Sequence, residues 1–411
     1  MERVVITGFG AISALGLGAD VNFKAALSGT SGIGRLQHPY AEQLSCGVAA
    51  QVLAPLPELI AKTEAALFDR VSLLALAAAN EAYAQSGLSV DAEQATRSSV
   101  FWGTGMGGAH TVEAAYEDLF VKNKRRVRPM SVIASMNNAA AAQIALKVGF
   151  GGAVTTYSSA CVSSAQAIGE ACRAIRHGYV DRAIAGGSEA LLTYAVLSAW
   201  DALRVLANTD AAHPERSCKP FSKNRNGLVL GEGGAALVLE SLSSAQARGA
   251  TILAELVGYG ISNDATHITK PDPAGQARAM QMALAEAQLP LSGIDYINAH
   301  GAATIAGDAA ETASIKAVFG EHAKPIMISS TKSVHGHTLG AAGALEFIIS
   351  LQALRANAVP PTAFLDDPDP ECDLDYVPLQ ARHNQELRAV MSNSFAFGGS
   401  NVALIAKKFE V

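Results

Sequence analysis

The feature of this sequence that most constrains its fold is an alternation of short, apolar runs with longer helical stretches. The short runs are rich in the β-branched and aromatic residues that strands favour. Most are continuously apolar, which is typical of strands covered on both faces. These runs lie at residues 3–8, 98–103, 154–159, 182–187, 235–240, 252–260, 295–300, 326–330, 389–394 and 402–408.

Apolar residues recur at helical spacing in the longer stretches, several of which end at glycine. These stretches cover residues 70–87, 163–178, 275–288, 309–320 and 340–356. The alternation predicts an α/β layered fold with parallel or mixed sheets. No Pro- or Ser-rich linker divides the chain, but one set of elements closes near residue 250 and a similar set follows. We therefore expect two pseudo-equivalent halves, residues 1–250 and 251–411, although no literal sequence repeat relates them.

Composition narrows the class of protein. The chain is 49% hydrophobic and 17% charged, against about 25% charged in an average soluble domain, which predicts a large core or an oligomer. Its net charge of −6 argues against nucleic-acid binding, which requires a basic face. A local exception is the basic run KNKRRVR at residues 122–128.

The cysteines indicate a reducing compartment. The chain has 5 of them, scattered and without a CxxC pair, so we expect neither a disulfide framework nor a metal site. Glu2 and the glycines near it do not fit a signal peptide. No apolar run reaches the roughly 18 residues that cross a bilayer. We expect a soluble, cytoplasmic protein without a membrane span.

Two glycine motifs follow predicted strands and resemble dinucleotide-binding loops. GFGAIS begins at Gly8, and GTGMGG begins at Gly103. A dinucleotide site also needs an acidic residue about 20 positions later at the end of a strand. The corresponding residues are Ser28 and Asn123, so tight turns after strands are the better interpretation.

Cys161 is a candidate nucleophile. It follows the predicted strand at residues 154–159 and precedes the helix that starts at residue 163. At a helix N-terminus, free N–H groups and the helix dipole favour an anion and lower a thiol pKa. Buried cysteines are nevertheless common and mostly inert. This segment alone leaves both roles open, and Cys172, further along the same helix, is interpreted as packing.

Two histidines and a lysine strengthen the case. His300 ends the strand-like YINAH, and His337 lies in STKSVHGHT before a glycine turn. Such strand ends gather ligands in α/β folds. Lys332 lies five residues before His337 and is a candidate for the same site. A lone histidine is more often structural, but two in these positions beside Cys161 favour catalysis.

NSFAFGGSN at residues 393–401 is the remaining informative string. Phe395 and Phe397 on a Gly-rich loop would be awkward at a plain surface. They can line or gate an apolar pocket, while loop N–H groups form an oxyanion hole. A hydrophobic plug in the core is the alternative, and this string alone does not decide between them.

Taken in order, SSAC at 158–161, NAHG at 298–301, STKSVHGH at 330–337 and NSFAFGGSN at 393–401 resemble the β-ketoacyl-[acyl carrier protein] synthases of type II fatty-acid and polyketide pathways. The resemblance spans nearly the whole chain, from VVITGFG to NVALIAKK. It implies an acyltransferase with the thiolase-like layered αβαβα fold. The expected reaction is a decarboxylative Claisen condensation that extends a fatty-acid, polyketide or polyene chain.

The resemblance assigns the roles of individual residues. Cys161 accepts the acyl chain as a thioester, and His300 and His337 stabilise the enolate that forms as malonyl carrier protein loses carbon dioxide. Lys332 supports the site electrostatically and pairs with Glu346. Phe397 is the gate with Phe395 beside it, and the N–H groups of Cys161 and Phe397 form the oxyanion hole.

For the pockets, the resemblance places Met106 at the limit of the acyl pocket and Thr304 on the pantetheine arm. Three departures from the family pattern stand out. Ala302 removes one pantetheine-binding hydroxyl, at a cost of about 1 kcal/mol. Ala396 replaces a glycine of the gate, where a Cβ disfavours positive φ. His335 is an additional imidazole without an assigned role.

Carrier proteins are acidic, so we expect a basic docking patch. The resemblance places Lys62, Arg125, Arg126 and Arg204 there. Ala65 and Ala66 stand at other positions that are basic in the family, so the patch carries less charge on that side. A solvated loop is the alternative for residues 122–128. We expect no cofactor on the enzyme itself, since the substrates arrive on carrier-protein phosphopantetheine. The protein is expected to be a homodimer or a heterodimer with a ketosynthase-like chain-length factor.

Two alternative functions stay open. The chain could be a non-catalytic, chain-length-factor-like subunit, against which Cys161, His300 and His337 argue. It could also be an acyl-thioester hydrolase, since Cys plus His suits that reaction. Acyl length, saturation and pathway are not readable from the sequence, although the changes at Ala302 and Ala396 favour a specialised pathway over membrane-lipid synthesis.

Overall fold

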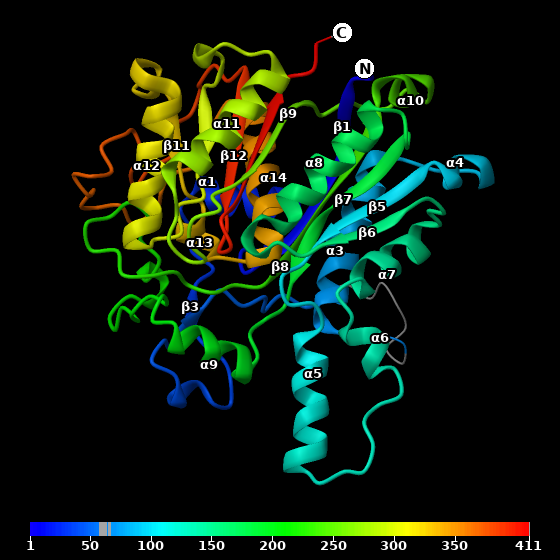
Figure 1. Cartoon of the computed structure of the whole chain (residues 1–411), viewed down its shortest axis with the longest axis vertical. Coiled ribbons are helices and arrows are strands. Elements are labelled where there is room, and N and C mark those ends of the chain that lie inside the picture. Colours follow the sequence, from blue (N-terminus) through cyan, green and yellow to red (C-terminus); the bar gives the residue numbers. More distant parts are fainter. Residues whose placement is uncertain (57–63, 65–66, 411) are drawn as a thin grey trace.

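The computed structural model describes residues 1–56, 64 and 67–410. Its centre is an 11-stranded sheet with the order β11-β10-β12-β13-β9-β1-β8-β7-β5-β6, and β2 pairs with β1 (Figure 1). The strands before residue 250 are β1 (Val4–Ser13), β2 (Gly16–Leu17), β5 (Ser98–Gly103), β6 (Val154–Tyr157), β7 (Arg182–Glu189) and β8 (Gly233–Ser241). Those after it are β9 (Ala254–Asn263), β10 (Tyr296–Asn298), β11 (Met327–Ser329), β12 (Ala389–Phe395) and β13 (Ser400–Lys407).

The two sets of strands pair in the same way. In the first set β1–β8 and β8–β7 are antiparallel, whereas β7–β5 and β5–β6 are parallel. In the second set β9–β13 and β13–β12 are antiparallel, whereas β12–β10 and β10–β11 are parallel. A short antiparallel contact of Val5 and Ile6 in β1 with β9 joins the sets. The expected pair of similar halves is therefore present in the topology, while the boundary at residue 250 stays a prediction.

The continuous apolar character of the strands follows from burial on both faces. In β8, Leu237 and Leu239 pack into one hydrophobic cluster, and the intervening Val238 packs into another. In β13, Leu404 and Ile405 divide between clusters in the same way. Since side chains alternate along a strand, each strand supplies two layers of core.

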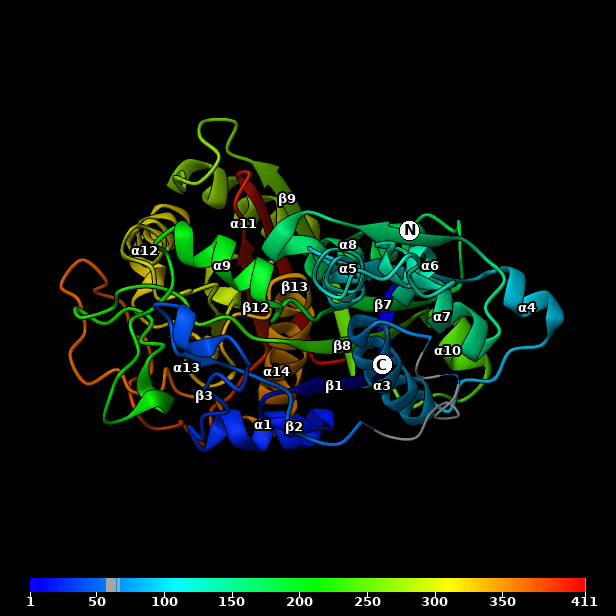
Figure 2. The same cartoon turned by 90° about the horizontal axis from the view of Figure 1, so that it is seen from below.

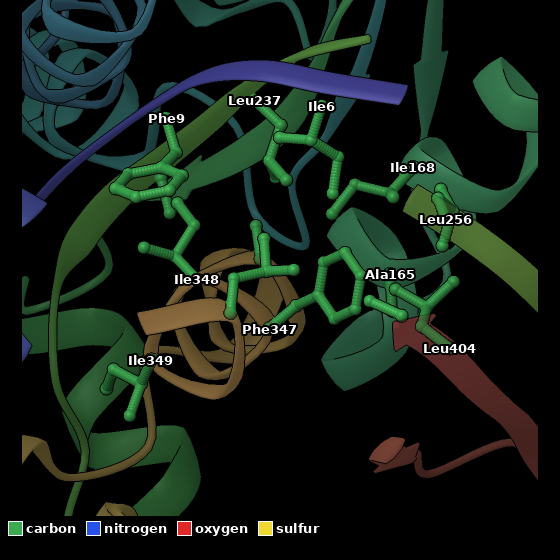
Figure 3. Packing of buried hydrophobic residues seen from close by; sticks show 14 of the residues in the cluster. Ile6, Phe9, Ala165, Ile168, Leu237, Leu256, Phe347, Ile348, Ile349 and Leu404 are labelled. Atoms are coloured by element: carbon green, nitrogen blue, oxygen red, sulfur yellow. The ribbon is translucent and has the colours of Figure 1, made fainter. Parts of the chain in front are cut away.

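Two helices form the layer between the sheet halves, namely α8 (Ser163–Arg176) and α14 (Ala342–Ala356). Figure 3 shows Ile168 of α8 and Phe347 of α14 packed between Ile6 and Leu237 on one side and Leu404 on the other. Gly343 on α14 permits close approach, because a Cβ there would lie 2.7 Å from the Cβ of Ala165. These two helices follow β6 and β11, the strands that lead to Cys161 and His337.

The outer layers complete the fold. α3 (Arg70–Ser86) and α7 (Ala139–Val148) pack against β5, β7 and β8, while α11 (Pro273–Ala287) and α12 (Ile305–Phe319) pack against β10, β12 and β13. Figure 2 shows α3 and α7 on one side of the molecule, α11 and α12 on the other, and α14 between them. The predicted layered αβαβα fold is confirmed.

One described segment, Leu339–Ala356, passes a length-and-composition test for a membrane span, with a mean hydropathy of 1.3. It is not an uninterrupted apolar run, because Glu346 and Arg355 lie within it. In the structure 89% of the segment is buried inside the protein. Its apolar character is that of a core helix.

An arm projects from the body (Figure 1). It consists of α5 (Ala109–Tyr116), the π-helical turn Glu117–Val121, a loop and α6 (Ser131–Ser135). The remaining helices are α1 (Ala19–Leu27), α4 (Ala92–Thr96), α9 (Tyr194–Ala202), α10 (Leu242–Ala247) and α13 (Lys332–His335). A small hairpin is formed by β3 (Gly34–Arg35) and β4 (Val48–Ala49), and short 3₁₀ turns lie at Ala41–Gln43, Ala160–Val162, Pro214–Arg216, Leu291–Gly293, Gly320–Ala323 and Leu339–Ala341.

The first glycine motif was wrongly interpreted as a turn, because β1 runs through it. A Cβ on Gly8 would lie 2.2 Å from the carbonyl oxygen of Ala82, and one on Gly10 would lie 2.3 Å from that of Ala78. Both carbonyls belong to α3. These glycines therefore allow α3 to pack directly onto the strand.

Candidate active site

Cys161 lies in the 3₁₀ turn Ala160–Val162 that links β6 to α8, and its side chain is buried. The preceding Ala160 has φ of +51°, an uncommon conformation for a residue with a Cβ. This sharp turn directs the chain from the sheet into α8. The thiol is thereby held at the start of a central helix.

The sequence-based expectation of a lowered thiol pKa is wrong for this closed site. Burial raises the pKa of Cys161 to about 12, while Lys332 and a backbone hydrogen bond from Phe397 oppose the rise. Desolvation disfavours the thiolate more strongly than the surrounding dipoles favour it. The resting sulfur is a neutral thiol.

His337 contacts Cys161 directly, with 3.0 Å between its Nε2 atom and Sγ. Its Nδ1 atom accepts the N–H of Leu339 at 3.2 Å. An imidazole nitrogen that accepts a hydrogen bond carries no proton, so the neutral ring bears its proton on Nε2. His337 therefore presents an N–H donor to the sulfur.

His300 follows β10 and lies against His337, with 5.2 Å between the ring centroids. Glu311 of α12 accepts the backbone N–H groups of His300 and Gly301 at 2.9 and 2.8 Å. Lys332 donates to the His300 carbonyl oxygen at 2.6 Å and lies 3.4 Å from Nδ1. Because an ammonium group only donates, it favours the tautomer of His300 with its proton on Nε2.

Both histidines are uncharged. Burial lowers the pKa of His300 and of His337 well below the ordinary value, and the charge of Lys332 lowers both further. Neutral rings with protonated Nε2 atoms can donate to developing negative charge without first losing a proton to solvent.

Lys332 and Glu346 form an ion pair of 2.5 Å with neither side chain exposed. Burial raises the pKa of Glu346, and Lys332 opposes that rise. The pair anchors the lysine beneath His300. A buried pair of this kind contributes little net stability but is costly to break.

His335 lies behind this pair, outside the pocket. Its Nε2 atom is 3.0 Å from Oγ1 of Thr331 and 4.0 Å from Oε1 of Glu346. Burial lowers the pKa of His335 to about 3. The additional imidazole is therefore a neutral core residue next to the Lys332–Glu346 pair.

A cavity of about 230 Å³ connects the candidate residues. Cys161, His300, His337, Phe395 and Phe397 line it. Thr304 and Ala302 line it as well, as the pantetheine assignment expects, but Met106 does not. The Met106 side chain is 47% exposed on the loop after β5, so its role at the acyl pocket stays a prediction.

In the NSFAFGGSN loop, the Cβ of Ala396 does not meet the positive φ that it would disfavour. Ala396 is not among the residues with positive φ, which in this loop are Gly398 at +89° and Gly399 at +77°. Its methyl group instead packs against two hydrophobic clusters. An alanine is tolerated because the glycines that follow it make the turn.

In the loop after His300, the departure Ala302 and its neighbour Ala303 have different surroundings. Ala302 lines the cavity, whereas Ala303 is fully buried in an apolar cluster with φ of +63°. The hydroxyl of Thr304 accepts the N–H of Gly307 at 3.2 Å and caps α12. Only the change at Ala302 therefore alters the lining of the cavity.

Sequence reasoning missed several supporting residues. Arg225 donates to the carbonyl oxygens of Thr304 and Ile305 at 3.2 and 2.9 Å. Glu189 accepts the N–H groups of Gly105, Met106 and Gly340 at 2.7, 3.0 and 3.0 Å. The amides of the second glycine motif are thus occupied by an internal carboxylate.

Two buried carboxylates, Glu189 and Glu311, carried a usable sequence signal. Glu189 ends a strand that is apolar from Ala183 to Gly187, and Glu311 lies one helical turn before the buried Ile315 of α12. An acidic residue at a position that the pattern predicts to be buried needs a partner. Trp200, on α9, also lines the cavity and carried no such signal.

The proposed docking residues are only partly described. Arg125 and Arg126 are exposed on the loop of the arm, and Arg204 is exposed just after α9. Lys122 and Lys124 of the same basic run pair with Asp118 at 3.4 and 3.0 Å. Lys62, Ala65 and Ala66 lie outside the described residues.

Chemically, the cavity brings together a thiol and two imidazole N–H donors around one small volume. The described residues contain no group of three or more His, Cys, Asp and Glu side chains arranged to hold a metal ion. A covalent thioester on Cys161 and a negatively charged oxygen facing the imidazoles both fit this arrangement.

Comparisons with known proteins cover most of the chain. A family model described as "Beta-ketoacyl synthase, N-terminal domain" matches residues 1–245, and one described as "Beta-ketoacyl synthase, C-terminal domain" matches residues 253–366. Nodulation protein E of Rhizobium meliloti (strain 1021) is 44% identical over 407 residues, which is 99% of each chain. The 3-oxoacyl-[acyl-carrier-protein] synthase 2 of Staphylococcus aureus (strain COL) is 41% identical over 412 residues, covering 100% of this chain and 99% of that protein.

Solved structures agree over the full length. The ishigamide ketosynthase/chain length factor superimposes with a TM-score of 0.91 at 33% identity and covers 100% of both chains. A type II PKS acyl-carrier protein in complex with its ketosynthase gives a TM-score of 0.90 at 30% identity, again with 100% coverage of both chains.

Proposed function

The chain belongs to the β-ketoacyl synthase family, and from this premise we propose how its cavity performs the family's acyl transfer and condensation. It is a β-ketoacyl-[acyl carrier protein] synthase with the thiolase-like fold. The observation that carries the residue assignment is the convergence of the Cys161 sulfur with two neutral imidazoles, His300 and His337.

In the first half-reaction, the Cys161 sulfur attacks the thioester carbonyl of an acyl chain on carrier-protein phosphopantetheine. The N–H groups of Cys161 and Phe397 stabilise the oxyanion of the tetrahedral intermediate. The pantetheine sulfur leaves and takes the proton that the Cys161 thiol gives up. The acyl chain is then held as a thioester on Cys161.

In the second half-reaction, malonyl carrier protein enters and its thioester oxygen accepts the Nε2–H groups of His300 and His337. The carboxylate leaves as carbon dioxide, and its bonding electron pair forms an enolate that the two donors stabilise. The α-carbon of this enolate attacks the Cys161 thioester. A carbon–carbon bond forms and the carbon–sulfur bond breaks, so that the β-ketoacyl chain remains on the carrier protein. The Cys161 sulfur leaves as a thiolate and takes a proton from water to restore the thiol.

Lys332 and Glu346 have supporting roles in this scheme. Lys332 holds the backbone of His300 and favours the Nε2 tautomer, while Glu346 holds Lys332. Phe397 closes the cavity over Cys161, with Phe395 beside it. Thr304 and Ala302 flank the pantetheine arm.

The proposed partner is an acyl carrier protein that docks on Arg125, Arg126 and Arg204, with Lys62 beyond the described residues. All three arginines are exposed, as a docking patch for an acidic protein requires. No cofactor on the enzyme is needed, because the substrates arrive on the carrier's phosphopantetheine. A cytoplasmic location fits this supply of substrates.

We propose further that the enzyme is a dimer, either of two copies or with a chain-length factor. The arm carries exposed apolar residues, and β6 is an edge strand in the described part of the sheet. The exposed apolar residues of the arm region are Val112, Tyr116, Phe120, Val121, Val132, Ile133 and Met136. Such patches and edges are typical of protein interfaces. A solution mass of one 42.4-kDa chain would contradict a homodimer.

The test is mass spectrometry after incubation with acyl- and malonyl-carrier protein. The proposal predicts an acyl adduct on Cys161 and a β-ketoacyl product two carbons longer than the primer. Cys161→Ala should abolish extension, while decarboxylation of malonyl carrier protein persists because both histidines remain. Free acyl acid as the product would indicate the hydrolase alternative, and no adduct would indicate a chain-length-factor-like subunit.

A further inference from the structure

The side chain of Phe397 stacks on Trp200, an aromatic residue outside the family motifs of the sequence. Their ring centroids are 5.9 Å apart and the ring planes differ by 19°. Offset stacking at this separation is a favourable aromatic geometry. Both rings line the cavity that contains Cys161, His300 and His337.

Trp200 is the fixed member of the pair. The helix that carries it, α9, has its first N–H groups bonded to Glu113 of the arm, from Tyr194 at 3.0 Å and from Ala195 at 2.7 Å. Near the other end of α9, Asp201 accepts hydrogen bonds from Ser45. Leu197 is buried, so α9 is held at both ends and along one face.

Phe397 is the movable member. Gly398 and Gly399 follow it directly in the left-handed region, and no atom lies within 4 Å of a Cβ placed on Gly398. The N–H of Gly398, directly after Phe397, donates to the carbonyl oxygen of Ile268 at 2.7 Å, and Gly399 donates to that of Ala396 at 3.1 Å. A Cβ on Gly399 would lie 3.0 Å from the Cβ of Asp264, so the open position at Gly398 is the natural hinge.

A closed Phe397 is incompatible with a loaded substrate in the present cavity. The cavity of about 230 Å³ is smaller than the roughly 300–1,000 Å³ of typical ligand sites. A pantetheine arm and an acyl chain must both reach Cys161. Phe397 therefore has to leave Trp200 in each catalytic cycle.

We propose that Trp200 is a positioning residue that latches Phe397 over Cys161 through the aromatic stack, and thereby sets how often the active site opens. The proposal deepens the function assigned above and rests on it for its catalytic consequence. The latch keeps the unloaded site closed between catalytic cycles, and the hinge at Gly398 lets the carrier-bound substrate displace Phe397. A weaker stack gives an unloaded site that is open more often.

The first experiment measures alkylation of Cys161 by iodoacetamide, followed peptide by peptide in wild-type protein, Trp200→Leu and Trp200→Phe. Opening hydrates the sulfur and restores its thiolate fraction, so the rate reports how often the gate is open. Removing a stack of typical strength should raise the Cys161 rate about two- to tenfold in Trp200→Leu. Trp200→Phe keeps an aromatic face and should remain within about twofold of wild type, by the same scale.

Cys172 is the internal control for unfolding, because it is fully buried on α8 and outside the cavity. A parallel rise at Cys172 in Trp200→Leu would mean general loosening and would overturn the latch. An unchanged Cys161 rate in a folded Trp200→Leu would overturn it as well. This assay needs no carrier protein, so it can fail or succeed independently of the condensation test.

A second measurement follows the native Trp200 by its fluorescence. The signal of Trp200 can be separated because the chain has 2 tryptophans, and the other, Trp102, is fully buried in β5. Acyl loading of Cys161 should expose Trp200 to acrylamide quenching, and the Trp200→Phe protein supplies the Trp102 background. Identical quenching before and after loading, with the adduct verified by mass, would contradict the proposal.

Discussion

The Nε2 atom of His337 lies 3.0 Å from the Sγ atom of Cys161, and the N–H of Leu339 fixes the proton of His337 on that nitrogen. The imidazole is thus an N–H donor facing the nucleophile. It can stabilise negative charge first on the sulfur and later on the enolate oxygen. The consequence can be tested by changing the donor alone.

His337→Leu should lower the rate of malonyl decarboxylation by about 10²–10³, the usual cost of one lost oxyanion donor. His337→Gln should retain more activity, because its amide can still donate from a position near that of Nε2. Both rates are measured as carbon dioxide release from malonyl carrier protein. His383→Gln, at an exposed histidine, is the matched control and should behave as wild type. Equal rates for the Leu and Gln variants would contradict the donor role.

Lys332→Met should destabilise the protein by about 3–5 kcal/mol, because it leaves the buried Glu346 without its partner. Adding Glu346→Gln should recover a large part of this loss. Urea unfolding of the two single variants and the double variant measures the coupling. Additive losses in the double variant would show that the 2.5 Å pair does not act as a unit.

His335 should make stability fall as the pH falls below about 6.5. Its folded pKa is lowered to about 3, so between these values the unfolded chain binds a proton that the folded chain does not. The stability contribution is therefore complete above the unfolded pKa and decreases toward acid.

His335→Asn removes this proton uptake. Relative to wild type, the variant should gain about 1.4 kcal/mol on going from pH 7.5 to pH 5.5, since the lower pH is one unit below the unfolded pKa. Urea midpoints of both proteins at the two pH values give this double difference. A difference near zero would mean that His335 becomes protonated in the folded state.

Ala302→Thr should lower KM for malonyl carrier protein several-fold with little change in kcat. A new hydroxyl at this lining position can bond the pantetheine arm, at a net gain of about 1 kcal/mol. Ala303→Ser is the control, because Ala303 is buried in an apolar cluster. That variant should lose about 1–3 kcal/mol of stability through an unpaired hydroxyl without improving KM. Steady-state kinetics and thermal unfolding separate the two effects, and an unchanged KM in Ala302→Thr would show that the arm does not pass Ala302.

The layered fold could be predicted from the sequence because a strand that is buried on both faces is a continuous run of apolar residues. Strands such as β8 and β13 are apolar on both faces. That pattern implies that helices cover the sheet on both sides. The glycines of β1 were misinterpreted for a related reason. Glycine at a turn and glycine beneath a closely packed helix are identical in sequence, and only the contact with α3 distinguishes them.

The candidate site likewise has features that the sequence determined and features that only the tertiary structure decided. By itself, the sequence determined the reacting residue types, Cys161, His300, His337 and Lys332, and their order along the chain. Only the tertiary structure decided their protonation and pairing: a thiol whose pKa is raised, imidazoles that present Nε2–H, and a gate held against Trp200. The physical reason is that desolvation and hydrogen-bond partners depend on neighbours from distant segments, whereas the chemistry available to a side chain is fixed by its identity.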